Sequence, residues 1–296
     1  MKFKTIARRW HRITQQATNV PYAFVQDRMK EGAYQPCYVS KHVQQVTKDD
    51  TMKMDPGAED AIKWTASVMY AGGADTTVSV ISGFVLAMVM FPEVQKKAQK
   101  EIDTVIGSSR LPELQDQGQL PYISAVVKEA LRWFPIAPMG TPHAADDDIH
   151  YKEYIIPKGS LILTATWWFQ NDPQVYVNPS AFEPERFIAP RNEPDPIETV
   201  FGSGRRICPG KYLADMSLFW TISRILAVFD IRQAVDESGM PIEATRHLQP
   251  GLITHPEEFP FNIVVRSPAH AKLVENIEKS LPLQSGDDKL LNFQGW

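Results

Sequence analysis

The sequence is poor in cysteine, with only Cys37 and Cys208 among its 296 residues. Two cysteines rule out a disulfide framework and suit a reducing compartment. A structural zinc site is also excluded near Cys208, because no further Cys or His lies there at ligand spacing. Any metal chemistry at Cys208 must therefore depend on a single thiolate.

Neither sign of charge predominates. The 31 basic and 35 acidic residues leave a net charge of −4, which gives no reason to expect nucleic-acid binding. Internal repeats are lacking too. Hydrophobic residues make up 43% and charged residues 22%, as is ordinary for a globular protein with a large core and one or two domains.

The first 17 residues are basic and carry an apolar stripe that includes Phe3, Trp10 and Ile13. An Arg-rich transit peptide is one interpretation. No cleavage pattern or Ser-rich stretch supports it, so an amphipathic surface helix is favoured. We expect Pro21 to interrupt this helix and residues 22–30 to resume it.

Residues 59–91 form the longest apolar stretch, and Asp75 is the one charged residue between Trp64 and Phe91. A stretch of this length could cross a bilayer. A carboxylate in mid-span is costly, however, so a helix buried in a large soluble core is favoured.

Two adjacent glycines, Gly72 and Gly73, lie inside this helix and weaken it by about 1 kcal/mol each relative to alanine. Without side chains they would let a flat ligand lie against the helix. The neighbouring Asp75 and Thr76 offer a carboxylate and a hydroxyl that could relay protons. The alternative is a kink with a solvated acid and a capping threonine.

The second cysteine lies in the loop Phe-Gly-Ser-Gly-Arg-Arg-Ile-Cys-Pro-Gly, residues 201–210, which precedes a predicted helix over 211–229. Gly202 and Gly204 permit a tight turn and a close approach to a flat partner. The helix N-terminus and the guanidinium groups of Arg205 and Arg206 favour the thiolate of Cys208, the form that soft and borderline metals bind. A nucleophilic cysteine with a distant His base and a buried free cysteine are the alternatives.

The order Phe-x-x-Gly-x-Arg-x-Cys-x-Gly resembles the haem-binding loop of the cytochrome P-450 family. The resemblance implies that Cys208 is the axial thiolate and that Arg206 pairs with a haem propionate. Phe201 would pack on the proximal face of the haem, and Gly204 and Gly210 complete the cofactor-binding motif.

Residues 71–77, Ala-Gly-Gly-Ala-Asp-Thr-Thr, resemble the oxygen-activation segment of the same family. By this resemblance Gly72 and Gly73 lie against the haem, and Asp75 and Thr76 deliver protons during catalysis.

Two further segments match the family. Glu129 and Arg132 in Glu-x-x-Arg, with Arg186 in Pro-Glu-Arg-Phe, resemble a structural ion cluster that locks the region behind the haem. Many members place an arginine near His143 to contact the second propionate. Here His143 either replaces that donor or is a surface histidine.

The implied fold is mainly α with small β-sheets (α+β), the C-terminal, haem-binding part of the cytochrome P-450 fold. Residues 1–270 would form the haem domain, incomplete at its N-terminus, and 271–296 a polar tail. We expect a hairpin over 154–163 with Pro157 and Gly159 in its turn, a loop over 231–250 and short strands within 251–266.

The resemblance implies a monooxygenase that inserts one oxygen atom of O2 into a small apolar substrate, in secondary metabolism or detoxification. The cofactor would be haem b (iron protoporphyrin IX), with electrons from NADPH through a reductase that docks on the Cys208 side. Matching segments place eight residues toward the substrate: Met69, Ala71, Ala74, Ile136, Ala137, Met139, Leu252 and Ile253.

The segments Ala-Gly-Gly-Ala-Asp-Thr-Thr and Pro-Lys-Gly-Ser resemble those of fungal members linked to secondary metabolism. Relative to a full-length member, the chain is expected to start late and to lack a membrane anchor and a Pro-rich hinge. A full-length member would lie on the cytosolic face of the endoplasmic reticulum membrane, and this chain without an anchor would be cytoplasmic. Two alternatives stay open. One is a haem-thiolate isomerase, dehydratase or peroxygenase, and the other is a truncated, non-catalytic remnant.

Overall fold

A computed structural model describes residues 2–47 and 54–282. The chain divides into two compact units. The first contains the described residues up to Ala74, and the second runs from Asp75 to Pro282. Helix α3 (Pro56–Met90) supplies residues to both units.

The first unit contains α1 (Lys2–Lys30), α2 (Tyr38–Val46) and the beginning of α3. Its small core includes Tyr22, Met29, Val43 and Ile62. The expected interruption at Pro21 is wrong, because α1 continues through it. Proline removes one helical hydrogen bond, and burial of Tyr22 and Met29 on the following turns offsets that loss.

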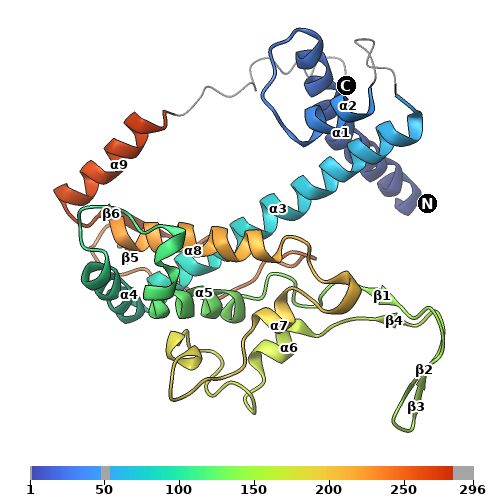
Figure 1. The fold of residues 1–296 in the computed structure, drawn as a ribbon. Helices are drawn as coiled ribbons and strands as arrows, with labels where there is room; N and C mark the ends of the chain where they lie inside the picture. The colour runs from blue at the N-terminus through green and yellow to red at the C-terminus, as the bar shows by residue number, and fades with distance from the viewer. Residues whose placement is uncertain (1, 48–53, 283–296) are drawn as a thin grey trace. The chain divides into compact units, whose positions relative to one another are not determined.

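The second unit is built on helices that meet in one large core. The later part of α3, α4 (Pro92–Val105), α5 (Pro121–Trp133) and α8 (Lys211–Val228) all contribute to it (Figure 1). Among the described helices, α3 alone is long and apolar enough to cross a membrane. Its residues from Val80 to Val89 are mostly buried in this core, as expected. The expectation of a helix buried over its whole length is corrected, because residues 68–75 are exposed.

Proline begins two of these helices, as expected. Pro92 and Pro121 occupy the first turns of α4 and α5, where the missing N–H costs nothing. The carboxylate of Glu101 on α4 accepts hydrogen bonds from the backbone N–H groups of Tyr122 (2.8 Å) and Ile123 (2.9 Å) at the start of α5. This contact fixes α5, which carries the Glu-x-x-Arg motif, against α4.

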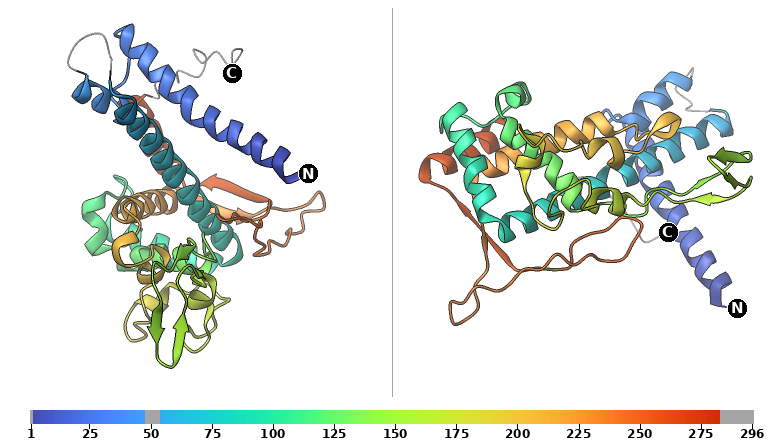
Figure 2. Two further views of the ribbon diagram at one scale, coloured as in Figure 1. Left: turned by 90° about the vertical axis from the view of Figure 1, so that its right-hand side faces the viewer. Right: turned by 90° about the horizontal axis from the view of Figure 1, so that it is seen from below.

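The strands form three small antiparallel pairs. β1 (His143–Ala144) pairs with β4 (Leu161–Ile162), and β2 (Ile149–Tyr151) pairs with β3 (Tyr154–Ile156). β5 (Phe229–Gln233) pairs with β6 (Phe261–Val265). The β2–β3 hairpin projects away from the helices of its unit (Figure 2).

Two expectations about the strands are corrected. The hairpin turn lies at Lys152–Glu153, where Lys152 adopts a φ of 53°, and the turn at 157–160 instead joins β3 to β4. Residues 231–233 belong to β5 rather than to a loop. The side-chain amide of Gln95 both donates to and accepts from the backbone of Ile231 (2.9 and 2.8 Å), which holds this strand against α4.

Short helices complete the described chain: η1 (Leu114–Gln119), α6 (Thr166–Asn171), η2 (Pro184–Phe187), α7 (Ile197–Val200), η3 (Gly204–Arg206) and α9 (Pro268–Ser280). The domain boundary expected after residue 270 falls inside α9. Most of the expected polar tail, residues 283–296, lies outside the described residues.

Candidate active site

The cysteine loop, residues 201–210, connects α7 to α8. Gly202 and Gly204 have φ values of 70° and 63°, the left-handed region in which a Cβ atom is strained. A Cβ at either position would meet no atom within 4 Å, so backbone conformation rather than crowding requires glycine there. The backbone N–H of Cys208 donates to the carbonyl of Phe201 (2.8 Å) and closes the loop.

Cys208 is exposed and lies three residues before Lys211, where α8 begins. The positive end of the α8 dipole therefore lies close to the sulfur along the chain. Gly210 is next to the thiol, because a Cβ built there would be 3.7 Å from Sγ. Phe201 is half-buried and packs against the main core, so its ring anchors the loop to the second unit.

The groups around Cys208 fit a flat, largely apolar ligand that carries acidic groups. Arg205 and Arg206 are exposed, and neither forms an ion pair within the described part of the chain. Ile207, Tyr212 and Leu213 expose apolar side chains on either side of the cysteine in sequence. Haem matches this donor set: a thiolate for its iron, guanidinium groups for its propionates and apolar contacts for its ring.

The predicted oxygen-activation segment lies on α3, which runs through its two glycines without a break. Gly72 and Gly73 belong to the first unit, and a Cβ at either would meet nothing within 4 Å. Asp75 and Thr76 belong to the second unit, where Asp75 is exposed and Thr76 is half-buried.

Asp75 contacts a residue that the sequence did not single out. Its Oδ1 atom lies 3.0 Å from Nε2 of His255, in the loop before β6. The two residues are 180 positions apart, and a lone histidine in a loop carries no sequence signal for such a pair. The structure thus brings Asp75 into contact with His255. His143 forms no hydrogen bond with either residue. His143 lies exposed on β1, opposite Ile162 of β4.

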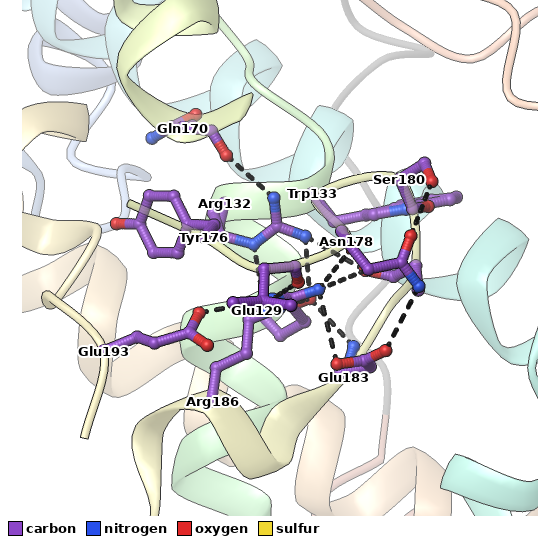
Figure 3. A network of polar contacts seen from close by, with 12 residues as sticks. Glu129, Arg132, Trp133, Gln170, Tyr176, Asn178, Ser180, Glu183, Arg186 and Glu193 are labelled. Carbon is purple, nitrogen blue, oxygen red and sulfur yellow. Dashed lines mark hydrogen bonds and ion pairs between the residues drawn. The ribbon is translucent and has the colours of Figure 1, made fainter. Parts of the chain in front are cut away.

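Glu129, Arg132 and Arg186 meet in a fully buried cluster, with each side chain 0% exposed (Figure 3). The Arg132 guanidinium grips Glu129 with two hydrogen bonds, Nε to Oε2 (2.7 Å) and Nη2 to Oε1 (2.8 Å). Nε of Arg186 lies 3.2 Å from Oε1 of the same carboxylate. One acid therefore holds two arginines.

Backbone carbonyl groups accept further hydrogen bonds from the two arginines. Arg132 donates to the carbonyls of Gln170 (2.8 Å) and Ala181 (3.1 Å). Arg186 donates to the carbonyls of Val177 and Asn178. The bonds of Arg132 fasten α6 and the segment after it to α5, and those of Arg186 fasten the same segment to η2.

A second acid, Glu193, pairs with Arg186 at 3.2 Å and is mostly buried. It balances the second guanidinium, and the motifs in the sequence did not identify it. Tyr176 places its ring 5.3 Å from the Arg132 guanidinium carbon. Burial raises the pKa of Tyr176 to about 12, so its neutral hydroxyl donates a hydrogen bond to the carbonyl of Pro194 (3.0 Å).

Comparison with known proteins places this chain in a family, because the family model for cytochrome P450 matches residues 1–262. The chain belongs to the cytochrome P450 family. It is 47% identical to cytochrome P450 monooxygenase CLM2 of Gibberella zeae, over 98% of this chain and 55% of that protein. It is 44% identical to multifunctional cytochrome P450 monooxygenase af510 of Aspergillus fumigatus, over 94% of this chain and 52% of that one.

A third relative of this cytochrome P450 chain is O-methylsterigmatocystin oxidoreductase of Aspergillus flavus, 37% identical over 96% of this chain and 53% of that protein. The chain spans about half the length of the curated relatives it matches. Its mainly helical architecture with small antiparallel sheets is the α+β fold of the family.

Proposed function

We propose that this chain carries the thiolate and proton-delivery residues of a haem-thiolate monooxygenase, which inserts one oxygen atom of O2 into a small apolar substrate. The exposed thiol of Cys208, in a glycine-turned loop between two arginines and a helix N-terminus, is the observation that carries the proposal. The names of the fungal relatives, which are monooxygenases, support it.

Cys208 would hold the iron of haem b through its thiolate, and Arg206 would neutralise one propionate. His143 is the candidate donor for the second. By the resemblance, Gly72 and Gly73 would leave room for the flat ring, because glycine carries no side chain. When bound, the haem supplies oxygen activation, which thiolate donation to iron favours.

Asp75 and Thr76 would move protons to the oxygen site. The Asp75 side chain is 56% exposed, so it can take a proton from water. Thr76 follows it directly and is half-buried, so its hydroxyl can pass a proton inward. Thr76→Ala should therefore release peroxide at the expense of product. Unchanged coupling between NADPH use and product would contradict the relay.

Electrons would come from NADPH through a reductase that docks beside the cysteine loop, where Arg205 and Lys211 are cationic. For the whole protein we propose a role in fungal secondary metabolism or detoxification and a place on the cytosolic face of the endoplasmic reticulum membrane. Fractionation of cells that express the full-length gene tests the location.

The decisive experiment is the absorption spectrum of the dithionite-reduced, carbon monoxide-bound protein, purified from haem-supplemented cells. Wild type and Cys37→Ala, the matched control, should show a strongly red-shifted Soret band, and Cys208→Ala should lose it. Absence of haem, or a band that survives Cys208→Ala, would refute the proposal.

The loaded protein would then be screened against a panel of apolar compounds for spectral shifts. Oxidation that requires NADPH and reductase supports a monooxygenase. Turnover without them, with peroxide or with no oxidant, would instead indicate a peroxygenase or an isomerase.

A further inference from the structure

The loop before β6 is fastened to α3 at two points. Oγ of Ser79 donates a hydrogen bond to the carbonyl of Thr254 (2.5 Å), and Nε2 of His255 lies 3.0 Å from Oδ1 of Asp75. Asp75 and Ser79 are four residues apart and so share one face of α3. Thr254 and His255 are adjacent, so the two contacts form a two-point clamp.

The same loop is tied to the segment that follows α5. Thr254 donates from its backbone N–H to the carbonyl of Ile136 (2.8 Å) and from Oγ1 to the carbonyl of Pro135 (2.8 Å). The backbone N–H of Gln249 donates to the carbonyl of His255 (2.8 Å) and closes the loop. Thr254 and Ser79 are buried, so this part of the clamp is structural.

The outer contact has a different character. The side chain of His255 is 28% exposed and that of Asp75 is 56% exposed, so water reaches both. An exposed aspartate with no partner samples several side-chain rotamers. With its proton on Nε2, His255 donates a hydrogen bond to Oδ1 and thereby selects one of these rotamers.

We propose that His255 is the positioning residue for Asp75: its ring holds the carboxylate in the orientation that passes protons to Thr76, while Ser79 and Thr254 only anchor the loop. This inference rests on the proposed monooxygenase function. It predicts that the two contacts of the clamp have separable effects.

The first test reads the contact itself and needs neither haem nor activity. Long-range proton–nitrogen spectra of the full chain should show His255 protonated at Nε2, and Asp75→Ala should shift those ring signals. The ring of His247, in the same loop, is the internal control and should not move. Identical His255 signals in wild type and Asp75→Ala would overturn the proposal.

Hydrogen exchange separates anchoring from positioning. Ser79→Ala should speed exchange of the Thr254 and Gln249 amides at least tenfold, because the buried carbonyl of Thr254 loses its partner. His255→Phe should change these rates less than threefold, and so should the matched control His247→Phe. Loosening of the loop by His255→Phe as great as that by Ser79→Ala would mean that His255 is merely an anchor.

The functional readout is the share of NADPH electrons recovered as peroxide, measured with reductase and the compound that gives the largest spectral shift. His255→Phe should raise this share at least threefold, and His255→Gln, whose amide can donate to Asp75, should restore it. Ser79→Ala should raise it less than His255→Phe. An unchanged share in His255→Phe overturns the positioning role. A wild type without a thiolate-ligated haem refutes the proposed function instead, and the ring spectra still decide the contact.

Discussion

The Glu129 cluster and the cysteine loop are both charged sites in the second unit, but they differ in how far their charged side chains are buried and paired. In the cluster, three charged side chains are 0% exposed and the arginines donate to carboxylates and carbonyls of the chain itself. In the loop, Cys208, Arg205 and Arg206 are exposed, and the arginines form no ion pair within the described residues. An unpaired buried charge has a high desolvation cost, whereas an exposed charge is hydrated and needs no partner within the protein. The Glu129 cluster is therefore part of the folded core, whereas the charged groups of the cysteine loop are accessible to a ligand.

The largest expected effect on the free energy of unfolding comes from removing the buried carboxylate of the Glu129 cluster. Glu129→Gln removes the charge that holds two buried arginines and should lower the free energy of unfolding by about 3–5 kcal/mol. Urea unfolding measures the loss. Glu93→Gln, an exposed acid on α4, is the control and should cost less than about 0.5 kcal/mol. A loss below about 1 kcal/mol for Glu129→Gln would mean that the cluster does not hold the fold.

Gly83 and Gly73 on α3 extend the comparison between buried and exposed regions. The Cβ of Gly83→Ala would lie 2.7 Å from Cγ of Phe134, which is fully buried, so we expect a loss of about 1–3 kcal/mol. Gly73→Ala meets nothing within 4 Å and should gain about 0.5–1 kcal/mol in the haem-free protein. It should also lower haem content. Thermal unfolding compares the two variants, and equal stability would remove the distinction.

A smaller, pH-dependent effect is expected at the buried Asp116, which forms an ion pair with Arg110. Hydrogen bonds from Arg110 (2.7 and 2.8 Å) hold the pKa of Asp116 below its usual value; burial opposes this, and the N–H of Glu113 adds to it. The unfolded chain therefore takes up the proton first. The resulting stability is present above the unfolded pKa of about 3.9 and is lost as the pH falls through the folded pKa.

Urea midpoints of wild type and Asp116→Asn, measured from neutral to acid pH, test this. The variant should be less stable at neutral pH, and the difference should shrink as the pH falls below about 4. A constant difference at every pH would show that the charge of Asp116 contributes nothing.

The smallest effect on stability should come from removing an exposed charge in the cysteine loop. Arg206→Leu removes an exposed side chain that forms no ion pair with any residue the structure describes, so the free energy of unfolding should change by less than about 0.5 kcal/mol. Haem content should fall severalfold, because one propionate loses its cation. Arg205→Leu is the matched control and should retain haem. Equal retention in both variants would remove Arg206 from the proposed site.

Local sequence signals predicted most of the helices. Prolines and apolar spacing located α4 and α5, and long apolar runs located α3 and α8, because these signals act within a short stretch of sequence. The errors have a common cause. Pro21 was expected to stop a helix that tertiary burial sustains, and residues 231–233 were expected in a loop although they pair with β6. In the hairpin, Pro157 and Gly159 do form a turn, but the strands on either side of it pair with other partners.

The sequence by itself determined the motifs of the chain: a cysteine between arginines and a helix start, a glycine pair beside an acid and a threonine, and Glu-x-x-Arg with a later arginine. Residue types and short spacings define these motifs. Only the tertiary structure decided that His255 meets Asp75, that Glu193 balances Arg186 and that Phe134 crowds Gly83. Asp75 and His255 are 180 residues apart, and Glu193, although only seven residues from Arg186, belongs to no motif with it. Packing of the folded chain brings these side chains within reach.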